Sequence, residues 1–332
     1  MSKYHIYGIG AALVDTEIEV SDNDLNKFNI DKGVMTLVDE DRQHQLMDLL
    51  SDHLVASKRA SGGSAANTII AASYFGAKNF YSCKVADDDN GNFYVDDLRS
   101  AGVDHHHNGE VPQGITGKCL VMITPDAERT MNTFLGISET LSEQELHLDA
   151  AKDAQYVYIE GYLVSSPTGK AAAIKLREFA EQNNVKTSLS LSDPAMVQFF
   201  GDGLKEMIGN KVDLLFCNGD EAMSFTKTSS IESAVAEIKN FCNTFAITLG
   251  ANGALVYDGT TTVTIAPHPV KAIDTNGAGD MFAGAFLFAI TNGYSFEEAG
   301  NLASLASSQL VTQFGPRLPA EQHQEIKRQV LN

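Results

Sequence analysis

Short apolar segments of strand length alternate with segments of helical periodicity along most of the chain. Seven segments have the character of buried strands: residues 4–9, 80–85, 156–159, 187–191, 214–217, 245–249 and 254–257. Between two of them, Ala172, Leu176 and Phe179 recur at the spacing of one helix face, and residues 231–242 and 296–311 have the same period. This alternation predicts right-handed β-α-β units, and therefore an α/β fold with a mainly parallel sheet covered on both faces.

A second set of β-like segments does not follow this alternation. Residues 13–20 and 34–38 are separated by a polar stretch, whereas residues 118–124 and 129–135 flank the turn-rich sequence Pro125-Asp126-Ala127-Glu128 and indicate a hairpin. These four segments predict a small sheet that stands off the main one. The pattern is equally compatible with a lid over a cleft and with an extension of the main sheet.

The composition limits the partners that such a chain can bind. Asp and Glu number 43 against 24 Lys and Arg, which gives a net charge of -19. Nucleic acid and anionic membrane surfaces would be repelled by most of this surface.

The four cysteines form no Cys-x-x-Cys pair, and Cys119 and Cys217 lie in apolar runs, as small core residues do. We therefore expect a reducing, cytoplasmic location. No signal peptide is expected, and the longest apolar run, residues 281–290, is too short to cross a bilayer.

A glycine-rich turn with an acid at each end precedes that apolar run. Its sequence is Asp274-Thr275-Asn276-Gly277-Ala278-Gly279-Asp280. Glycines let the backbone approach an anion closely, and the start of the following helix adds partial positive charge. The amide groups of residues 277–279 are therefore candidates for an anion hole, with Asp280 in the first helical turn. The alternative is that Asp280 only complements the helix dipole. The turn is not a P-loop, because no Gly-Lys-Ser/Thr follows it.

A second glycine-rich helix start occurs at Gly62-Gly63, with Asn67 one turn inside the helix. This arrangement suits the binding of ligand hydroxyls. It is also what a simple helix start with Ser64 as the cap would look like. Asp15, at the end of the first strand, is a further candidate, because the carboxyl ends of strands line the ligand crevice of open α/β sheets.

Two strand ends later in the chain carry polar residues. Asn218 and Glu221 follow a buried strand and could orient a hydrated magnesium ion, or could only cap the next helix. Thr248 and Gly250 form a similar strand-to-turn sequence that a hairpin would also explain.

Two other motifs are weaker. Gly8 and Gly10 half match a dinucleotide fingerprint, but Leu13 replaces its last glycine and no helix follows. The adjacent histidines at 105–107 point in different directions and indicate a surface loop rather than a metal site.

Together, these motifs resemble the PfkB (ribokinase-like) family of ATP-dependent kinases over nearly the whole chain. Residues 274–280 look like its second signature, Gly62-Gly63 with Asn67 like its first, and Asn218-x-x-Glu221 and 248–250 like its magnesium and nucleotide motifs. Residues 32–39, 128–133 and 160–163 are most similar to the adenosine kinase branch, particularly its bacterial members. The implied fold is a three-layer α/β/α core with a small β-sheet lid.

The resemblance also implies a role for each matching position. Asp280 would be the catalytic base, while Gly277, Ala278 and Gly279 would hold the transferred phosphoryl group and Arg129 would reach the phosphates from the lid. The implied acceptor ligands are Asp15, Gly62, Gly63 and Asn67, and the implied ATP ligands are Asn218, Thr248, Gly250, Gly253, Asn301 and Ala303. Glu221 would organise Mg²⁺ through water, and Asp274 and Asn276 fall where many members bind a monovalent cation such as K⁺.

The implied domain division separates a core, residues 1–12, 40–110 and 136–332, from a discontinuous lid, residues 13–39 and 111–135. The implied reaction transfers the γ-phosphate of ATP to the 5'-hydroxyl of adenosine, as in purine salvage, by a monomer or by a homodimer formed through the lid. The alternatives are a sugar kinase acting on ribose, fructose or 2-keto-3-deoxygluconate, and a non-catalytic ligand-binding protein.

An apolar acceptor pocket would favour adenosine, and a smaller polar one a sugar. Met35, Leu37, Phe134 and Leu135 are candidate base contacts or simple lid packing.

Overall fold

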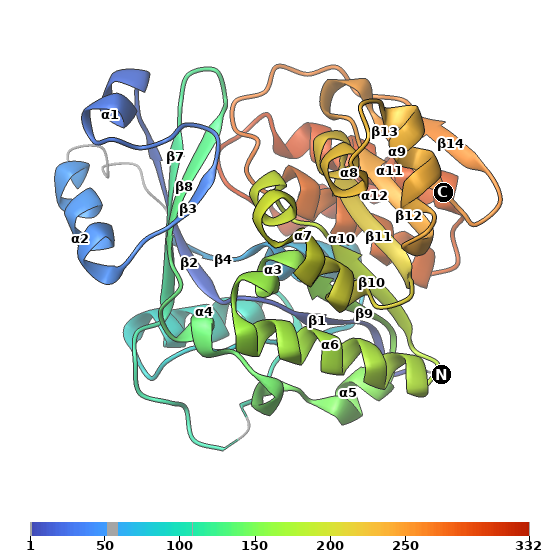
Figure 1. The fold of residues 1–332 in the computed structure, drawn as a ribbon, viewed down its shortest axis with the longest axis horizontal. Coiled ribbons are helices and arrows are strands. Elements are labelled where there is room, and N and C mark those ends of the chain that lie inside the picture. Colours follow the sequence, from blue (N-terminus) through green and yellow to red (C-terminus); the bar gives the residue numbers. More distant parts are fainter. Residues whose placement is uncertain (1, 52–58, 108, 332) are drawn as a thin grey trace.

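The computed structural model describes residues 2–51, 59–107 and 109–331, and its largest element is a nine-stranded sheet (Figure 1). The strand order is β14-β13-β12-β11-β10-β9-β1-β5-β6. The strands are β1 (Tyr4–Ile9), β5 (Asn79–Ser82), β6 (Val103–Asp104), β9 (Ala154–Glu160), β10 (Lys186–Ser190), β11 (Val212–Asn218), β12 (Cys242–Thr248), β13 (Ala254–Tyr257) and β14 (Thr262–Ile265). All pairs from β6 to β12 are parallel, and β13 and β14 add antiparallel strands at one edge. The predicted, mainly parallel sheet is confirmed.

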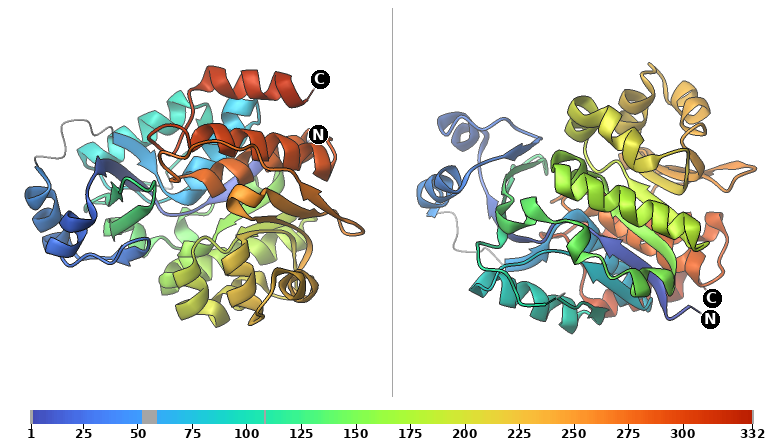
Figure 2. Two further views of the ribbon diagram at one scale, coloured as in Figure 1. Left: turned by 90° about the horizontal axis from the view of Figure 1, so that it is seen from above. Right: turned by 60° about the horizontal axis from the view of Figure 1, so that its bottom comes forward.

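Helices cover both faces of this sheet, which gives the predicted three layers (Figure 2). One face carries α3 (Ser64–Phe75), α4 (Asp89–Ser100), α10 (Ala278–Thr291), α11 (Phe296–Leu310) and α12 (Ala320–Val330). The other carries α5 (Leu148–Lys152), α6 (Pro167–Gln182), α7 (Pro194–Ile208), α8 (Gly219–Thr226) and α9 (Ile231–Ile238). Successive residues of a strand point to opposite faces, so Ile6 joins the first core and Tyr7 the second. Short 3-10 turns complete the chain: η2 (Gly136–Thr140), η3 (Glu143–Glu145), η4 (Gly161–Ser165) and η5 (Gly250–Asn252).

A five-stranded sheet of order β3-β8-β7-β2-β4 stands beside the main one (Figure 1). Its strands are β2 (Leu13–Glu19), β3 (Met35–Leu37), β4 (Arg59–Gly62), β7 (Gly117–Ile123) and β8 (Arg129–Phe134). The helices α1 (Asp22–Lys27) and α2 (Glu40–Leu49) pack on it through a separate apolar cluster that includes Leu25, Leu46 and Leu120. The four predicted strands are present, and the hairpin is β7-β8.

Several details differ from the sequence-based expectation. The polar segment β4 pairs with β2, and α2 packs on the smaller sheet, so these elements belong with it rather than with the predicted core range 40–110. The polar stretch between residues 20 and 34 is partly helical, because it contains α1. The predicted helix 231–242 ends at Ile238, because Cys242 already begins β12.

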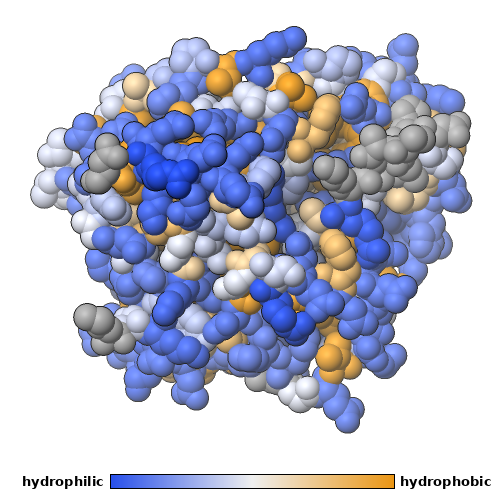
Figure 3. Space-filling model, turned by 180° about the vertical axis from the view of Figure 1, so that it is seen from behind, coloured by the Kyte–Doolittle hydropathy of each residue, from blue (hydrophilic) through white to orange (hydrophobic). Residues whose placement is uncertain are grey.

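On the face shown in Figure 3, the surface is mainly hydrophilic and apolar side chains form small separate groups. All four cysteines are free and buried, as predicted for Cys119 and Cys217. Within the described ranges, every helix is too short or too polar to span a bilayer. The histidines at 105–107 lie in a loop, as expected.

Candidate active site

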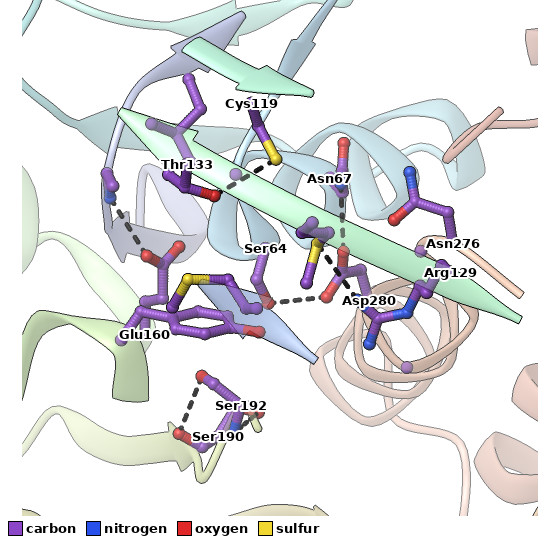
Figure 4. A pocket seen from close by; sticks show the side chains of 18 of the residues that line it. Ser64, Asn67, Cys119, Arg129, Thr133, Glu160, Ser190, Ser192, Asn276 and Asp280 are labelled. Carbon is purple, nitrogen blue, oxygen red and sulfur yellow. Dashed lines mark hydrogen bonds between the residues drawn. The ribbon is translucent and has the colours of Figure 1, made fainter. Parts of the chain in front are cut away.

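A pocket of about 340 Å³ lies between the two sheets, where the parallel strands β9 to β12 end (Figure 4). The starts of α3 and α10 form its floor, and strands β2, β3, β7 and β8 of the smaller sheet line its other side. It gathers many of the predicted residues: Asp15, Gly63, Asn67, Arg129, Asn218, Glu221, Thr248, Asn276, Gly277, Ala278, Gly279 and Asp280. These residues are distant in sequence, and the meeting of the two sheets brings them together.

The start of α10 has the geometry of an anion site. Gly277 caps the helix with φ of 75°, and a Cβ there would lie 2.7 Å from the carbonyl oxygen of Pro316. Only glycine fits this combination of positive φ and close backbone contact. The first amide groups of a helix have no acceptor inside the helix, and the helix dipole adds partial positive charge. Gly279, in this first turn, is exposed to the pocket.

Asp280 is held in the same turn by two donors from α3 (Figure 4). The Ser64 hydroxyl donates to Oδ1 at 2.6 Å, and Asn67 Nδ2 donates to Oδ2 at 3.0 Å. Burial raises the pKa of the Asp280 carboxyl above its ordinary value, while these hydrogen bonds and the Arg129 charge oppose the rise. The helices can approach closely because Gly284 of α10 has no side chain where it meets Ala71.

The suggestion that Ser64 caps α3 is wrong. Gly63 is the cap residue, with φ of 92° and no side-chain hydrogen bond to the helix. Ser64 is the first helical residue, so its hydroxyl is directed across to α10, where it serves Asp280.

Asp15 lies within β2 rather than at the end of the first strand, which corrects its predicted placement. The chain leaves β1 at Ile9 and enters the smaller sheet at Leu13, which places the Asp15 carboxyl in the pocket wall. Its atoms occupy the space where a side chain at Gly62 would be, so that glycine is required for the contact. Burial, followed by the neighbouring charge of Glu17, raises the pKa of Asp15 well above its ordinary value.

Arg129 extends from β8 of the smaller sheet, and Figure 4 shows its side chain beside Asp280. Its Nη1 contacts the Met131 sulfur at 3.2 Å. Although burial acts to lower the pKa of Arg129, the Tyr162 phenol and the carboxylates of Asp280 and Asp193 raise it overall. The guanidinium therefore faces the catalytic candidate from the smaller sheet.

Asn218 and Glu221 form a reciprocal helix cap at the start of α8. Asn218 N donates to Glu221 Oε2 at 2.9 Å, and Glu221 N donates to Asn218 Oδ1 at 2.8 Å. Burial raises the pKa of Glu221 to about 7. The parallel register pairs Asn218 with Thr248, which puts all three residues at one edge of the pocket. The capping alternative is therefore observed, and it leaves both side chains facing the pocket.

Several predicted ATP ligands, and the candidate base contact Phe134, do not join this group. The described pocket lining does not include Gly250, Gly253, Asn301, Ala303 or Phe134. Ala303 is fully buried in the core between α11 and the sheet, which differs from the predicted contact with adenine. Gly253 has φ of 86° and lies against the backbone of Ile265 and Ala266, as a turn between β12 and β13 requires.

Asp274 stabilises the glycine turn through hydrogen bonds to backbone amides. Its carboxylate is fully buried and accepts hydrogen bonds from Asn276 N at 2.8 Å and from Gly315 N at 2.9 Å. Asn276 Nδ2 donates to Glu17 Oε1 at 3.0 Å, which ties the turn to β2. Among the described residues, no three His, Cys, Asp or Glu side chains form a group that could hold a metal ion.

Sequence reasoning missed two residues that support this site. Arg317 donates from Nη1 to Asp97 at 2.7 Å, from Nη2 to the Ser61 hydroxyl at 2.8 Å and from Nε to the Asn67 side chain at 3.3 Å. Glu160, at the end of β9, lines the pocket. No motif around Arg317 distinguishes it, and Glu160 stands out only as the first residue of the segment 160–163, whose resemblance to the adenosine kinase branch implies no role for this side chain.

Comparison with known proteins agrees with this geometry. Residues 34–323 match the pfkB family carbohydrate kinase domain. An adenosine kinase structure from Sinorhizobium meliloti is 31% identical with a TM-score of 0.92, over 99% of this chain and 100% of that chain. A probable sugar kinase from Rhizobium etli CFN 42 is 32% identical with a TM-score of 0.91, over 99% of each chain. The adenosine kinase of Saccharomyces cerevisiae is 27% identical over 94% of this chain and 96% of its own length. The chain therefore belongs to the pfkB family of carbohydrate kinases, phosphotransferases that act on a hydroxyl group.

Proposed function

We propose that this protein is an ATP-dependent nucleoside kinase that phosphorylates the 5'-hydroxyl of adenosine, giving AMP and ADP. The observation that carries the proposal is the position of Asp280. Asp280 follows directly after Gly279, whose backbone is exposed to the pocket, and its carboxylate is oriented by Ser64 and Asn67. A hydroxyl and a phosphoryl group can therefore meet beside one fixed base.

The chemistry follows from this arrangement. Phosphoryl transfer passes through a loose transition state, so positioning and charge stabilisation provide most of the catalysis. Asp280 would accept the hydroxyl proton as the new oxygen–phosphorus bond forms. The fixed amides of residues 277–279 would meet the charge on the phosphoryl oxygens without reorganisation. Arg129 would add a positive charge from β8.

The pocket lining favours a nucleoside over a small sugar. Asp15, Gly63 and Asn67 present polar groups of the kind that bind ribose hydroxyls. Another part of the wall is apolar, with Leu13, Met35, Leu37, Met131, Leu135 and Tyr162. A planar base would be buried by such a wall, whereas a sugar alone would leave it without a partner. Two of the similar proteins are described as adenosine kinases and one as a probable sugar kinase.

ATP and magnesium fit the residues at the edge of the pocket. Asn218 and Glu221 each keep acceptor positions beyond their mutual cap, and carboxylate and amide oxygens suit hydrated Mg²⁺. When bound, the ion would neutralise phosphate charge. Thr248 lies beside them and would contact the nucleotide.

A monovalent cation such as K⁺ near Asp274 and Asn276 is a separate part of the proposal. Both Asp274 oxygens already accept amide hydrogen bonds, so backbone carbonyls would provide most ligands. Activity in KCl compared with choline chloride at equal ionic strength tests it.

We further propose a cytoplasmic enzyme of purine salvage, supported by four free, buried cysteines. The smaller sheet would act as a lid. Its strands β2, β3, β7 and β8 lie in the predicted ranges 13–39 and 111–135, and β4 and α2 extend it. Its edge strand β3 exposes Leu37 and is preceded by exposed Val34, which supports a homodimer formed through this edge as the alternative to a monomer.

The test is a coupled ADP-release screen of adenosine, inosine, guanosine, ribose, fructose and 2-keto-3-deoxygluconate. We expect adenosine to be the best acceptor. Strong turnover of a sugar with none of adenosine would replace the proposal by the sugar kinase alternative, and no turnover of any compound would favour a binding protein. Asp280→Asn, prepared in parallel, excludes a contaminating kinase.

A further inference from the structure

Glu160 is a buried carboxyl in the pocket wall that the phosphoryl-transfer chemistry does not use. It ends strand β9 and is 1% exposed. Its carboxyl occupies the space left by Gly10, where a side chain would overlap it. Ala11 N donates to Oε1 at 3.2 Å, and Ala65 N donates to Oε2 at 2.8 Å. Two backbone amides therefore fix its position.

This carboxyl still has unused acceptor capacity. A carboxylate accepts about four hydrogen bonds, and the two amides provide only two. Among the described residues, no cation lies within ion-pair distance of it. A buried acceptor group of this kind is costly unless a partner completes it. Burial accordingly raises the pKa of Glu160 to about 7. A ligand with N–H groups would supply the partner.

The position of Glu160 relative to the base matters for the kind of ligand. Figure 4 shows Glu160 and Asp280 on opposite sides of the pocket. The segments that hold Glu160 also provide apolar lining, with Leu13 two residues after Ala11 and Tyr162 two residues after Glu160. A nucleoside with its 5'-hydroxyl at Asp280 and its ribose at Asp15 would direct its base toward this apolar region.

We propose that Glu160 recognises the acceptor base by accepting hydrogen bonds from the exocyclic amino group of a 6-aminopurine. The inference rests on the proposed nucleoside kinase function and assigns its specificity to one residue. Adenosine presents an amino group at this position of the purine. Inosine presents a carbonyl oxygen instead. Above about pH 8 the Glu160 carboxyl is ionised and can only accept, so both oxygens would be left without a bond.

A purely structural role is the competing explanation. Glu160 links the bend between β1 and β2 to the start of α3, so its loss would also weaken the fold. A structural tie would lower the activity toward every acceptor alike. Base recognition would change the ratio between acceptors, and that ratio is the readout.

The first test measures kcat/KM of the full-length enzyme for adenosine and inosine in the wild type and in Glu160→Gln. The comparison is made at about pH 8.5, where the wild-type carboxyl is ionised. Glutamine keeps the shape, but its NH2 group replaces one oxygen that accepts from a backbone amide and adds an N–H donor that suits the inosine carbonyl. We expect the adenosine-to-inosine ratio to fall about 10–100-fold, mainly through KM. Glu143→Gln, an exposed carboxylate on η3, is the charge-matched control and should keep the wild-type ratio. An unchanged ratio in Glu160→Gln would overturn the inference.

A second test uses the wild type only and so does not depend on the folding of a variant. Purine riboside lacks the 6-amino group but keeps the ring and the ribose. We expect its KM to exceed that of adenosine about 10-fold or more. Equal KM values would overturn the assignment of Glu160 and leave the proposed function intact. Absence of adenosine turnover in the wild type would instead remove the proposed function itself.

Discussion

The starts of α3 and α10 are built alike and are used in opposite ways. Both helices begin at a glycine with positive φ, Gly63 at 92° and Gly277 at 75°, and neither has a side-chain cap. At α3, the amide of Ala65 is already bound by a carboxylate of the protein, that of Glu160. At α10, the residue in the corresponding position, Gly279, is exposed and lines the pocket beside Asp280.

The difference shows how one helix-start geometry can either hold the fold or bind a ligand. Both ends attract an anion because the helix dipole and the free amides act in the same direction. Where the chain provides the anion, the helix start becomes part of the wall. Where it does not, the site remains available for a phosphoryl group. The first turn of α3 then supplies neutral donors, Ser64 and Asn67, to the acid of α10.

The largest expected effect on turnover comes from removing the proposed base, Asp280, in the first turn of α10. Asp280→Asn should lower kcat about 10²–10⁴-fold with little change in acceptor binding, because the amide cannot accept the hydroxyl proton. Steady-state ADP release and calorimetric binding of adenosine measure the two quantities. Asp89→Asn, which changes an exposed acid in the first turn of α4, should leave both unchanged. Near-normal turnover of Asp280→Asn would contradict the assignment.

A substitution at Gly279, in the same turn, should lower activity without lowering stability. A Cβ at Gly279 would meet no atom within 4 Å, so Gly279→Ala should fold normally. Its methyl group would project into the proposed phosphoryl site and should reduce kcat/KM about 10–100-fold. Gly201→Ala is the matched control, since that glycine also has open space around its Cβ and lies outside this pocket. If Gly279→Ala retains full activity, the phosphoryl group binds elsewhere.

A smaller effect is expected from Arg317, the positioning residue behind α3. Arg317→Met removes the hydrogen bond to Asn67 and leaves Asp97 without its ion pair. We expect kcat to fall about 10-fold with KM nearly unchanged, because Asn67 would orient Asp280 less well. The melting temperature should also fall. Arg99→Met breaks an exposed pair with Asp96 and should change neither value. A rise in KM alone would point to a direct ligand contact instead.

The last effect concerns stability rather than turnover, and it shows how far the backbone amides of Ala11 and Ala65 compensate for the burial of the Glu160 carboxylate. The pKa of Glu160 is about 7 in the fold against an ordinary value of 4.5. The folded protein therefore binds a proton between these values that the unfolded chain has lost, and stability falls as pH rises from 4.5 to 7. Glu160→Gln should gain stability relative to the wild type between pH 5 and pH 8, by about 2–3 kcal/mol, because each pKa unit corresponds to about 1.4 kcal/mol. Urea unfolding at both pH values measures it, and an equal difference at pH 5 and pH 8 would show that the amides fully stabilise the anion.

Much of the catalytic centre could be predicted because its parts are local in sequence. The acid at 280 follows Gly277 by three residues, so any helix that begins there places it in the first turn. The strands of the main sheet are short apolar runs that can be recognised one by one. The strand β4 could not be found in this way, because Arg59-Ala60-Ser61-Gly62 contains no apolar pattern and becomes a strand only by pairing with β2.

The sequence by itself determined the alternating elements, the two glycine helix starts and the family of the chain. These features depend on periodicity and on local backbone conformation, which neighbouring residues control. The tertiary structure alone decided three contacts. The Ser64 hydroxyl donates to Asp280 rather than capping α3, the Glu160 carboxylate accepts from the Ala65 amide at the start of α3, and Arg317 donates to the Asn67 side chain. These contacts join residues separated by 216, 95 and 250 positions, so no local pattern can encode them. They exist because the packing of α3 against α10, and of two sheets around one pocket, brings those side chains together.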